Sequence, residues 1–252
     1  MLIYLTIKDK ENRIIMNTYP SKLSNYIIND RLLLSVAPRA GHHNLKWFIM
    51  CLQLDGRIKI ESTAQIRDPE RFYKIKLIRN PYHRAVSTFC MFCGCPDNKL
   101  FANPPFKYTH QEAMKLSFKQ FINSLKRLDL NTLNHHISSQ LDYYENVHYK
   151  YDEFIKTEDS KTMLPLVIDK LGIDKINLSI FNPVAGGGKG YNIKSKFRYD
   201  KKIFTMSYED ILTLVKNNNY NWPTYESYYD NKLKSLVAKI YRADLHDYDI
   251  EV

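Results

Sequence analysis

Two short apolar runs dominate the hydrophobic pattern, and the first lies at residues 31–37 (RLLLSVA). A run of this length and character is typical of a strand that is buried on both faces, and Pro38 ends it. After a turn over 39–44, apolar residues recur at i, i+3, i+4 and i+7 across 45–54, which predicts a helix. The pattern therefore predicts a strand–turn–helix unit over residues 31–54.

A second unit of the same kind follows over residues 73–92. Residues 73–78 (YKIKLI) have the character of a strand, and Arg79-Asn80-Pro81 breaks it because a residue before proline avoids the helical region. Pro81 can open a helix at its first turn, and the apolar spacing downstream continues this helix.

The remaining pattern is weaker and adds mainly helices. It predicts short strands at 2–7 and 13–16, helices at 117–128, 163–171, 211–215 and 225–245, and loops at 94–110 and 185–191. Strands that alternate with helices indicate an α/β fold with a central, mainly parallel sheet flanked by helices. Since no repeat or Pro/Ser-rich linker divides the chain, we expect a single domain over residues 1–252.

Charge narrows the class of partner. The 252 residues carry 37 Lys and Arg against 27 Asp and Glu, a net charge of +10, which favours an anionic partner such as a nucleic acid, a nucleotide, an acidic glycan or a membrane surface. No apolar run approaches the roughly 20 residues of a membrane span, and no basic region precedes the apolar N-terminal stretch. We therefore expect a soluble, cytoplasmic protein without a membrane span.

The turn of the first unit has the chemistry of an anion site. Backbone N–H groups at a helix N-terminus point outward and the helix dipole favours negative charge, while Arg39 and Lys46 add cations. The sequence GxxxxGK[ST] is absent, which excludes an ordinary P-loop NTPase and disfavours a nucleotide-dependent kinase. The alternative is a plain strand-to-helix turn with surface cations.

The second unit offers a similar set of donors. Arg79 leaves the end of a strand and Ser87 lies on the helix eight residues later, so a guanidinium fork and a hydroxyl are available to one phosphate. The alternative is that Arg79 pairs with a carboxylate and Ser87 is a surface residue.

Taken together, the order and spacing of the two turns resemble the carbohydrate sulfotransferases that use 3'-phosphoadenosine 5'-phosphosulfate (PAPS). The closest likeness is to the chondroitin- and dermatan-type branch, sulfotransferase family 2. Its P-K-V-A-C-T-N-W-K turn, which binds the 5'-phosphosulfate, and its R-D-P-F-E-R-L-x-S segment, which binds the 3'-phosphate, match here at Pro38, Asn44, Lys46, Arg79, Pro81, Arg84 and Ser87.

Three shorter matches follow in the same order, so the resemblance covers about residues 31–250. Residues 136–140 (HISSQ) resemble the family's H-W-x-P-Q, and residues 151–158 (YDEFIKTE) resemble its Y-D-x-I-x-K-x-E. Residues 240–248 contain Ile240, Tyr241, Asp244 and Tyr248 at the spacing of its I-Y-x-x-D-x-x-x-Y.

The resemblance implies a P-loop-NTPase-like sulfotransferase fold and the transfer of a sulfonate group from PAPS to an acceptor hydroxyl, on a carbohydrate, without a metal. The positions it assigns to the cofactor are Pro38, Arg39, Ala40, Gly41, His42, His43, Asn44, Lys46, Arg79, Arg84 and Ser87. The chain departs from the family where Arg39 replaces Lys, His42 and His43 replace Cys and Thr, and Asn80 replaces Asp. Arg39 keeps the charge but not the shape of the compact lysine donor.

Sulfonate transfer needs charge stabilisation and a base for the acceptor proton. Arg39 is the candidate for the first role. For the base, His136 comes first because of its family-like segment and ordinary imidazole pKa, and Glu61 second because related enzymes place a carboxylate or histidine between the two phosphate-binding segments. His42 and His43 come third. A purely structural role is the alternative for His136 and for Glu61.

Other interpretations remain open at this point. The chain could be a basic nucleic-acid-binding module, which predicts strongly salt-dependent affinity, or a degenerate family member that binds PAPS without transferring sulfonate. Cys90, Cys93 and Cys95 form C-x2-C-x-C, for which buried reduced thiols on the second helix are favoured over zinc.

Overall fold

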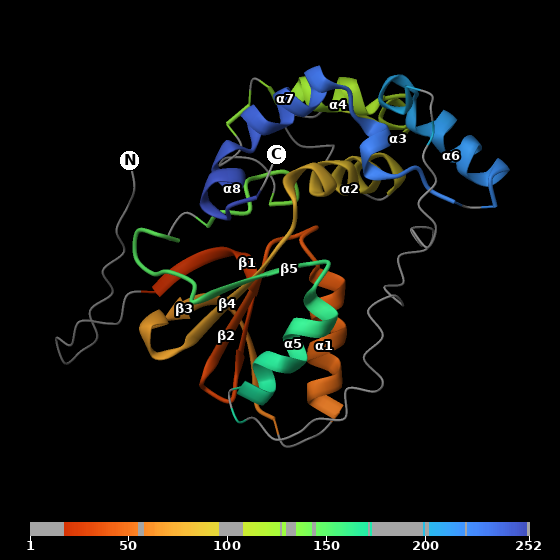
Figure 1. The fold of residues 1–252 in the computed structure, drawn as a ribbon. Helices are drawn as coiled ribbons and strands as arrows, with labels where there is room; N and C mark the ends of the chain where they lie inside the picture. Colours follow the sequence, from red (N-terminus) through yellow and green to blue (C-terminus); the bar gives the residue numbers. More distant parts are fainter. Residues whose placement is uncertain are drawn as a thin grey trace.

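The computed structural model contains a five-stranded sheet and a group of helices above one of its ends (Figure 1). It describes residues 18–54, 58–95, 108–126, 128–129, 135–142, 145–170, 172, 199, 202–219 and 221–250. The strands are β1 (Thr18–Ile28), β2 (Leu32–Val36), β3 (Ile60–Arg67), β4 (Tyr73–Ile78) and β5 (Glu153–Lys156). The α-helices are α1 (His42–Leu54), α2 (Pro81–Gly94), α3 (His110–Met114), α4 (Phe118–Leu125), α5 (Ser160–Lys170), α6 (Tyr208–Asn217), α7 (Asn231–Ile240) and α8 (Arg242–Asp247). Short 3-10 helices are η1 (Pro69–Arg71), η5 (Ile203–Thr205) and η6 (Tyr225–Tyr228).

The sheet is mixed, with strand order β3-β1-β2-β4-β5. Strands β2, β4 and β5 run parallel to one another, whereas β1 is antiparallel to both β2 and β3. The expected α/β class is therefore confirmed, and the expectation of a mainly parallel sheet is wrong. The reason is that β1 and β2 form a hairpin across a tight turn at Asn29-Asp30, where both residues have positive φ, as type I′ turns require.

Both predicted strand–turn–helix units are present as β2–α1 and β4–α2. The structure starts α1 at His42, three residues before the predicted start, and starts α2 at Pro81 with Asn80 as its N-cap. The Asn80 side chain accepts a hydrogen bond from the Tyr82 N–H, which satisfies one of the donors that a helix start leaves open.

The predicted single helix over 225–245 is wrong. The chain forms η6, α7 and α8 there instead. Asp230 interrupts the helical pattern because its side chain accepts a hydrogen bond from the Leu233 N–H and so begins α7. The predicted strands at 2–7 and 13–16 and the loop at 185–191 lie outside the described residues.

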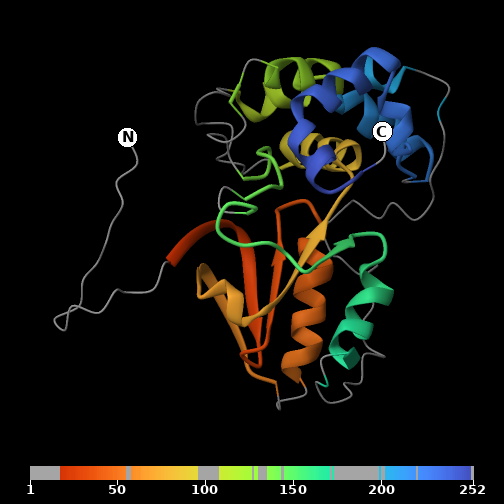
Figure 2. The same ribbon diagram turned by 60° about the vertical axis from the view of Figure 1, so that its left-hand side comes forward.

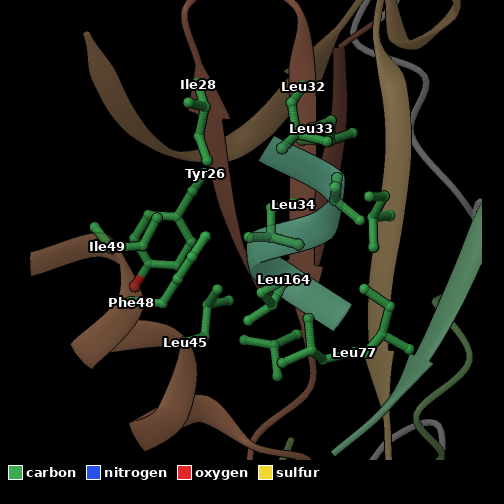
Figure 3. Close-up of a cluster of buried hydrophobic side chains, with 14 of the residues drawn as sticks. Tyr26, Ile28, Leu32, Leu33, Leu34, Leu45, Phe48, Ile49, Leu77 and Leu164 are labelled. Carbon is green, nitrogen blue, oxygen red and sulfur yellow. The ribbon is translucent and has the colours of Figure 1, made fainter. Parts of the chain in front are cut away.

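Apolar packing falls into two clusters. In the first, α1 and α5 lie alongside the sheet, and Figure 3 shows Leu45, Phe48 and Ile49 of α1 with Leu164 of α5 against the strands. The second joins α2, α3, α4, α6 and α7 around Phe89, whose ring lies 5.5 Å from that of Phe118. Cys90 and Cys93 are buried on α2 and neither is in a disulfide, as expected, and burial raises the pKa of Cys90 to about 12.

Figure 2 shows the helices of the second cluster above the upper end of the sheet, which is the end where β2 and β4 finish. Among the described residues, no helix is long and apolar enough to cross a membrane. Within the same residues, no group of three His, Cys, Asp or Glu side chains is placed to hold a metal ion.

Candidate functional site

Three turns meet at the carboxyl ends of the parallel strands. Val36 is level with Leu77 on β4, and Ile78 is level with Lys156 on β5, so the segments after β2, β4 and β5 leave the sheet at one edge. In open α/β sheets this edge is where ligands bind. Two helix N-termini, of α1 and α2, lie at the same edge and contribute the positive ends of their dipoles.

The turn after β2 is held in an unusual backbone conformation. Arg39 has φ of 66° and Gly41 has φ of 97°, both in the left-handed region, and the Ala40 N–H donates to the Ala37 carbonyl at 3.0 Å. A Cβ atom on Gly41 would lie 3.0 Å from Cγ2 and 3.1 Å from Oγ1 of Thr157. Only glycine therefore combines this φ with the close approach of β5's end.

Thr157 connects all three turns. Its hydroxyl lies 2.9 Å from the carbonyl of Ala40 and 2.9 Å from the carbonyl of Ile78, and its N–H donates to Ile78 at 2.8 Å. The threonine thus fixes the turn after β2 to the end of β4. The YDEFIKTE match in the sequence indicated this segment but assigned it no role.

The two arginines expected to bind a nucleotide lie next to each other. Arg79 Nη1 donates to the Arg39 carbonyl at 3.0 Å, while Arg39 Nη2 donates to the Ser87 hydroxyl at 2.7 Å and to the Ser87 carbonyl at 3.0 Å. The structure therefore brings Arg39, Arg79 and Ser87 together from two turns and one helix, although 48 residues separate Arg39 from Ser87.

Tyr225 of η6 is the residue at this site that the sequence analysis missed. Arg79 Nη2 donates to its hydroxyl, and the guanidinium lies 5.4 Å from its ring centre. The ring of Tyr225 also stacks on that of His83, with 4.3 Å between the ring centres. Nδ1 of His83 lies 3.4 Å from Oε1 of Glu158. Local pattern placed Tyr225 within a packing helix, and no local signal marks its contact with Arg79.

A pocket opens between α2 and the segment that leads into η6. It is lined by Arg39, Ser87, Cys90, Trp222, Tyr225 and Tyr228, among others. The guanidinium of Arg39 and the hydroxyl of Ser87 therefore lie next to aromatic side chains in this pocket. Such a pocket suits a ligand with an anionic group and a planar ring.

Two of the expected cofactor-binding residues, Arg84 and Lys46, have different surroundings in the structure. Arg84 is 1% exposed, and its three nitrogens donate to the carbonyls of Pro38, Ser138 and His135 at 3.1, 2.6 and 3.2 Å. Arg84 thus supports the turn from inside the protein. Lys46 is exposed on α1 and forms no ion pair within the described part of the chain.

The other expected cofactor-binding residues of this turn make contacts within the protein or have side chains that are not described. Pro38 and Ala40 contribute carbonyls to Arg84 and Thr157, and His42 Nε2 lies 3.2 Å from the Ser24 hydroxyl. The side chains of His43 and Asn44 lie outside the described residues, although both residues belong to the first turn of α1.

His136 lies near the charged end of the site. Burial lowers its pKa to about 4, and the nearby charges of His135, Arg39, Arg84 and His42 contribute to the same shift. The imidazole is therefore neutral at pH 7 and has a lone pair for a proton. An anion bound beside Arg39 would offset these positive charges and raise the pKa of the imidazole, which would make it a stronger base.

Glu61 is not brought to the site. It is exposed on β3 and pairs with Ile27, which in turn pairs with Leu33 near the amino end of β2. Arg39 follows the opposite end of the same strand. Glu61 lies at the far end of the sheet because it is near the start of β3, which runs in the same direction as β2.

Comparison with known proteins adds no further identification. No family model matches the chain, and neither a curated protein nor a solved structure matches it.

Proposed function

We propose that the protein is a PAPS-dependent sulfotransferase that transfers a sulfonate group to an acceptor hydroxyl, on a carbohydrate. The observation that carries the proposal is the convergence of Arg39, Arg79 and Ser87 at the carboxyl edge of two adjacent parallel strands. In this assignment the turn over residues 38–44 and the N-terminus of α1 hold the 5'-phosphosulfate, and Arg79 with Ser87 holds the 3'-phosphate. A P-loop-like sulfotransferase fold is part of the same proposal.

Sulfonate transfer requires charge stabilisation, a base for the acceptor proton and correct orientation of the donor. Arg39 and the amides at the start of α1 stabilise charge on the leaving phosphate oxygen as its bond to sulfur breaks. The acceptor oxygen forms the new bond to sulfur, and His136 takes the acceptor proton. Arg79, placed beside the Arg39 carbonyl, orients the nucleotide so that donor and acceptor lie in line.

Nucleotide binding requires the two arginines to exchange partners. Arg39 is bonded to Ser87, and Arg79 is bonded to Tyr225. A phosphate can replace the hydroxyl partners because it carries negative charge, which a hydroxyl lacks, and because it can accept two parallel N–H bonds from one guanidinium. Ser87 would then become free to donate its own hydroxyl hydrogen to the nucleotide.

Calorimetry with 3'-phosphoadenosine 5'-phosphate (PAP) tests the binding part of the proposal. Arg79→Ala should weaken binding by at least ~10-fold, since it removes a charged bidentate donor worth ~1.5–3 kcal/mol. Arg71→Ala is the matched control because Arg71 is exposed at η1, before the amino end of β4, and its guanidinium lies over Phe72. Absence of PAP binding by the unmodified protein, with strong salt-dependent binding of generic DNA instead, would favour the nucleic-acid-binding module.

A protein that binds PAPS without transferring sulfonate is the second candidate, and two observations favour it. Arg39 stands where the similar enzymes have Lys, and the pKa of His136 is low for a base in the free protein. Acceptor screening with labelled PAPS separates the two candidates. Transfer that His136→Ala abolishes while PAP affinity persists supports the enzyme, and PAP binding without transfer to any hydroxyl acceptor supports the binding protein.

A further inference from the structure

The backbone of Arg79 is held at both of its polar groups by one buried side chain. Gln140 Oε1 accepts a hydrogen bond from the Arg79 N–H at 2.9 Å, and Gln140 Nε2 donates to the Arg79 carbonyl at 2.8 Å. Arg79 is the first residue beyond β4, so the strand ladder does not fix its conformation. The paired contact from Gln140 does so instead, in the manner of one extra rung of a sheet.

Gln140 is itself fixed by two other parts of the chain. Its backbone N–H donates to Asp244 Oδ1 at 2.8 Å, and its carbonyl accepts from Lys76 Nζ at 2.8 Å. Its side-chain nitrogen also lies 3.4 Å from Asp244 Oδ2. Gln140 is fully buried, so these contacts account for each of its backbone and side-chain polar groups.

Asp244 is the central acceptor of this arrangement. It lies on α8, is fully buried, and accepts hydrogen bonds from the Ser139 hydroxyl and from the N–H groups of Gln140 and Leu141. All three of these bonds end on Asp244 Oδ1, while Oδ2 lies 3.4 Å from the Gln140 side-chain nitrogen. The loop over residues 139–141 therefore takes its conformation from a residue more than 100 positions further along the chain.

We infer that Asp244 is a positioning residue for the anion site: through Gln140 it sets the backbone of Arg79 and thereby the direction of its guanidinium. The C-terminal helix α8 is then a functional part of the site, although it contributes no atom to the pocket lining. The effect on ligand affinity rests on the proposed function, whereas the effect on the Arg79 backbone does not. A partner of this kind typically contributes ~10- to 100-fold to the function of the residue it orients.

Three variants separate positioning from simple stabilisation. Asp244→Asn keeps the size of the side chain but offers an amide nitrogen where donors point. Gln140→Met keeps the length of the side chain, deletes both bonds to Arg79 and adds no charge. Tyr241→Phe is the control, because it deletes one hydrogen bond to the segment just before this loop, at the Ile137 carbonyl 2.9 Å away, and leaves the bonds of Gln140 and Arg79 intact.

Hydrogen exchange of the Arg79 amide and PAP affinity are measured for each variant, beside its thermal midpoint. In Asp244→Asn and Gln140→Met, we expect Arg79 amide exchange to accelerate by at least ~10-fold relative to Tyr241→Phe, and PAP affinity to fall by at least ~10-fold. Exchange is compared at temperatures that lie the same number of degrees below the thermal midpoint of each variant, so that differences in global stability do not contribute.

The outcomes are distinguishable. If the Arg79 amide exchanges in Asp244→Asn and Gln140→Met as it does in Tyr241→Phe, the positioning role is wrong, whatever the affinity. Should Asp244→Asn fail to fold, Asp244→Glu, which keeps the carboxylate but moves its oxygens, replaces it in the same comparison with Tyr241→Phe. If the unmodified protein does not bind PAP while the amide exchange changes as expected, the proposed function is wrong and the positioning of Arg79 stands.

Discussion

Replacement of Gly41 by alanine tests the close packing of the turn after β2 against the end of β5. Two costs arise from the structure. A residue with a Cβ at φ of 97° is strained, which costs ~1–2 kcal/mol. The new methyl group would also lie 3.0 and 3.1 Å from two atoms of Thr157 and 3.5 Å from Leu77, and overpacking of this kind costs ~1–3 kcal/mol.

Thr157 has little freedom to move away from such a methyl group. Its one hydroxyl hydrogen is shared between the carbonyls of Ala40 and Ile78, so a rotation that relieves the contact breaks a hydrogen bond worth ~0.5–1.5 kcal/mol. Together these effects predict that Gly41→Ala lowers the free energy of unfolding by ~2–5 kcal/mol.

Gly172 provides the matched control, because it has φ of 62° and a Cβ added there would meet no atom of the described residues within 4 Å. Gly172→Ala therefore carries only the backbone strain, and urea denaturation of both variants gives the steric contribution of Thr157 by difference. Thr157→Ser in the Gly41→Ala background removes the 3.0 Å methyl contact and should recover part of the loss. Equal destabilisation by Gly41→Ala and Gly172→Ala would refute the steric part of the reasoning.

Three further predictions concern single contacts. Tyr225→Phe keeps the ring over Arg79 but removes the hydroxyl that a phosphate would displace, so PAP should bind ~2- to 10-fold more tightly in calorimetry; weaker binding would show that the hydroxyl contacts the ligand. Because the pKa of His136 falls to about 4 in the folded protein, the unfolded chain binds a proton at a higher pH, and stability is lost as the pH falls from about 6.5 towards 4. The urea midpoints at pH 5 and pH 7.5 should therefore differ less in His136→Asn than in the unmodified protein. An unchanged difference contradicts this prediction. Lys76→Met leaves Glu145 buried without its cation and should cost ~3–5 kcal/mol of unfolding free energy, whereas adding Glu145→Gln should restore much of it; no recovery would mean that the ion pair is not the source of the loss.

Local sequence signals determined the two units that build the site. The apolar run before Pro38 and the Asn80-Pro81 break identify β2–α1 and β4–α2, because each depends on contacts within a few residues: burial of a short strand, the fixed φ of proline and the cap of a helix. The same signals placed Arg39 and Arg79 at strand ends. Arg39 and Arg79 lie at one edge of the sheet because β2 and β4 are parallel neighbours.

Only the tertiary structure decided which cations face the site and which are buried. Arg84 and Lys76 have the residue type of surface charges, yet each is buried and bonded to carbonyls of the loop around residues 135–140. Glu61 lies in sequence between the two turns but at the other end of the sheet. Strand order and register, which place these residues, depend on pairings between distant segments that no local pattern encodes.

The C-terminal segment shows the same division most clearly. Its apolar spacing predicted one long helix, and the structure has the shorter helix α7 there, with Leu233 and Val237 buried. The same spacing could not reveal that Asp244 binds the loop that holds Arg79, or that Tyr225 accepts a hydrogen bond from its guanidinium. Sequence thus determined the local elements, through interactions of near neighbours. The positions of the charged groups at the site were decided by hydrogen bonds between residues 40 to 146 positions apart.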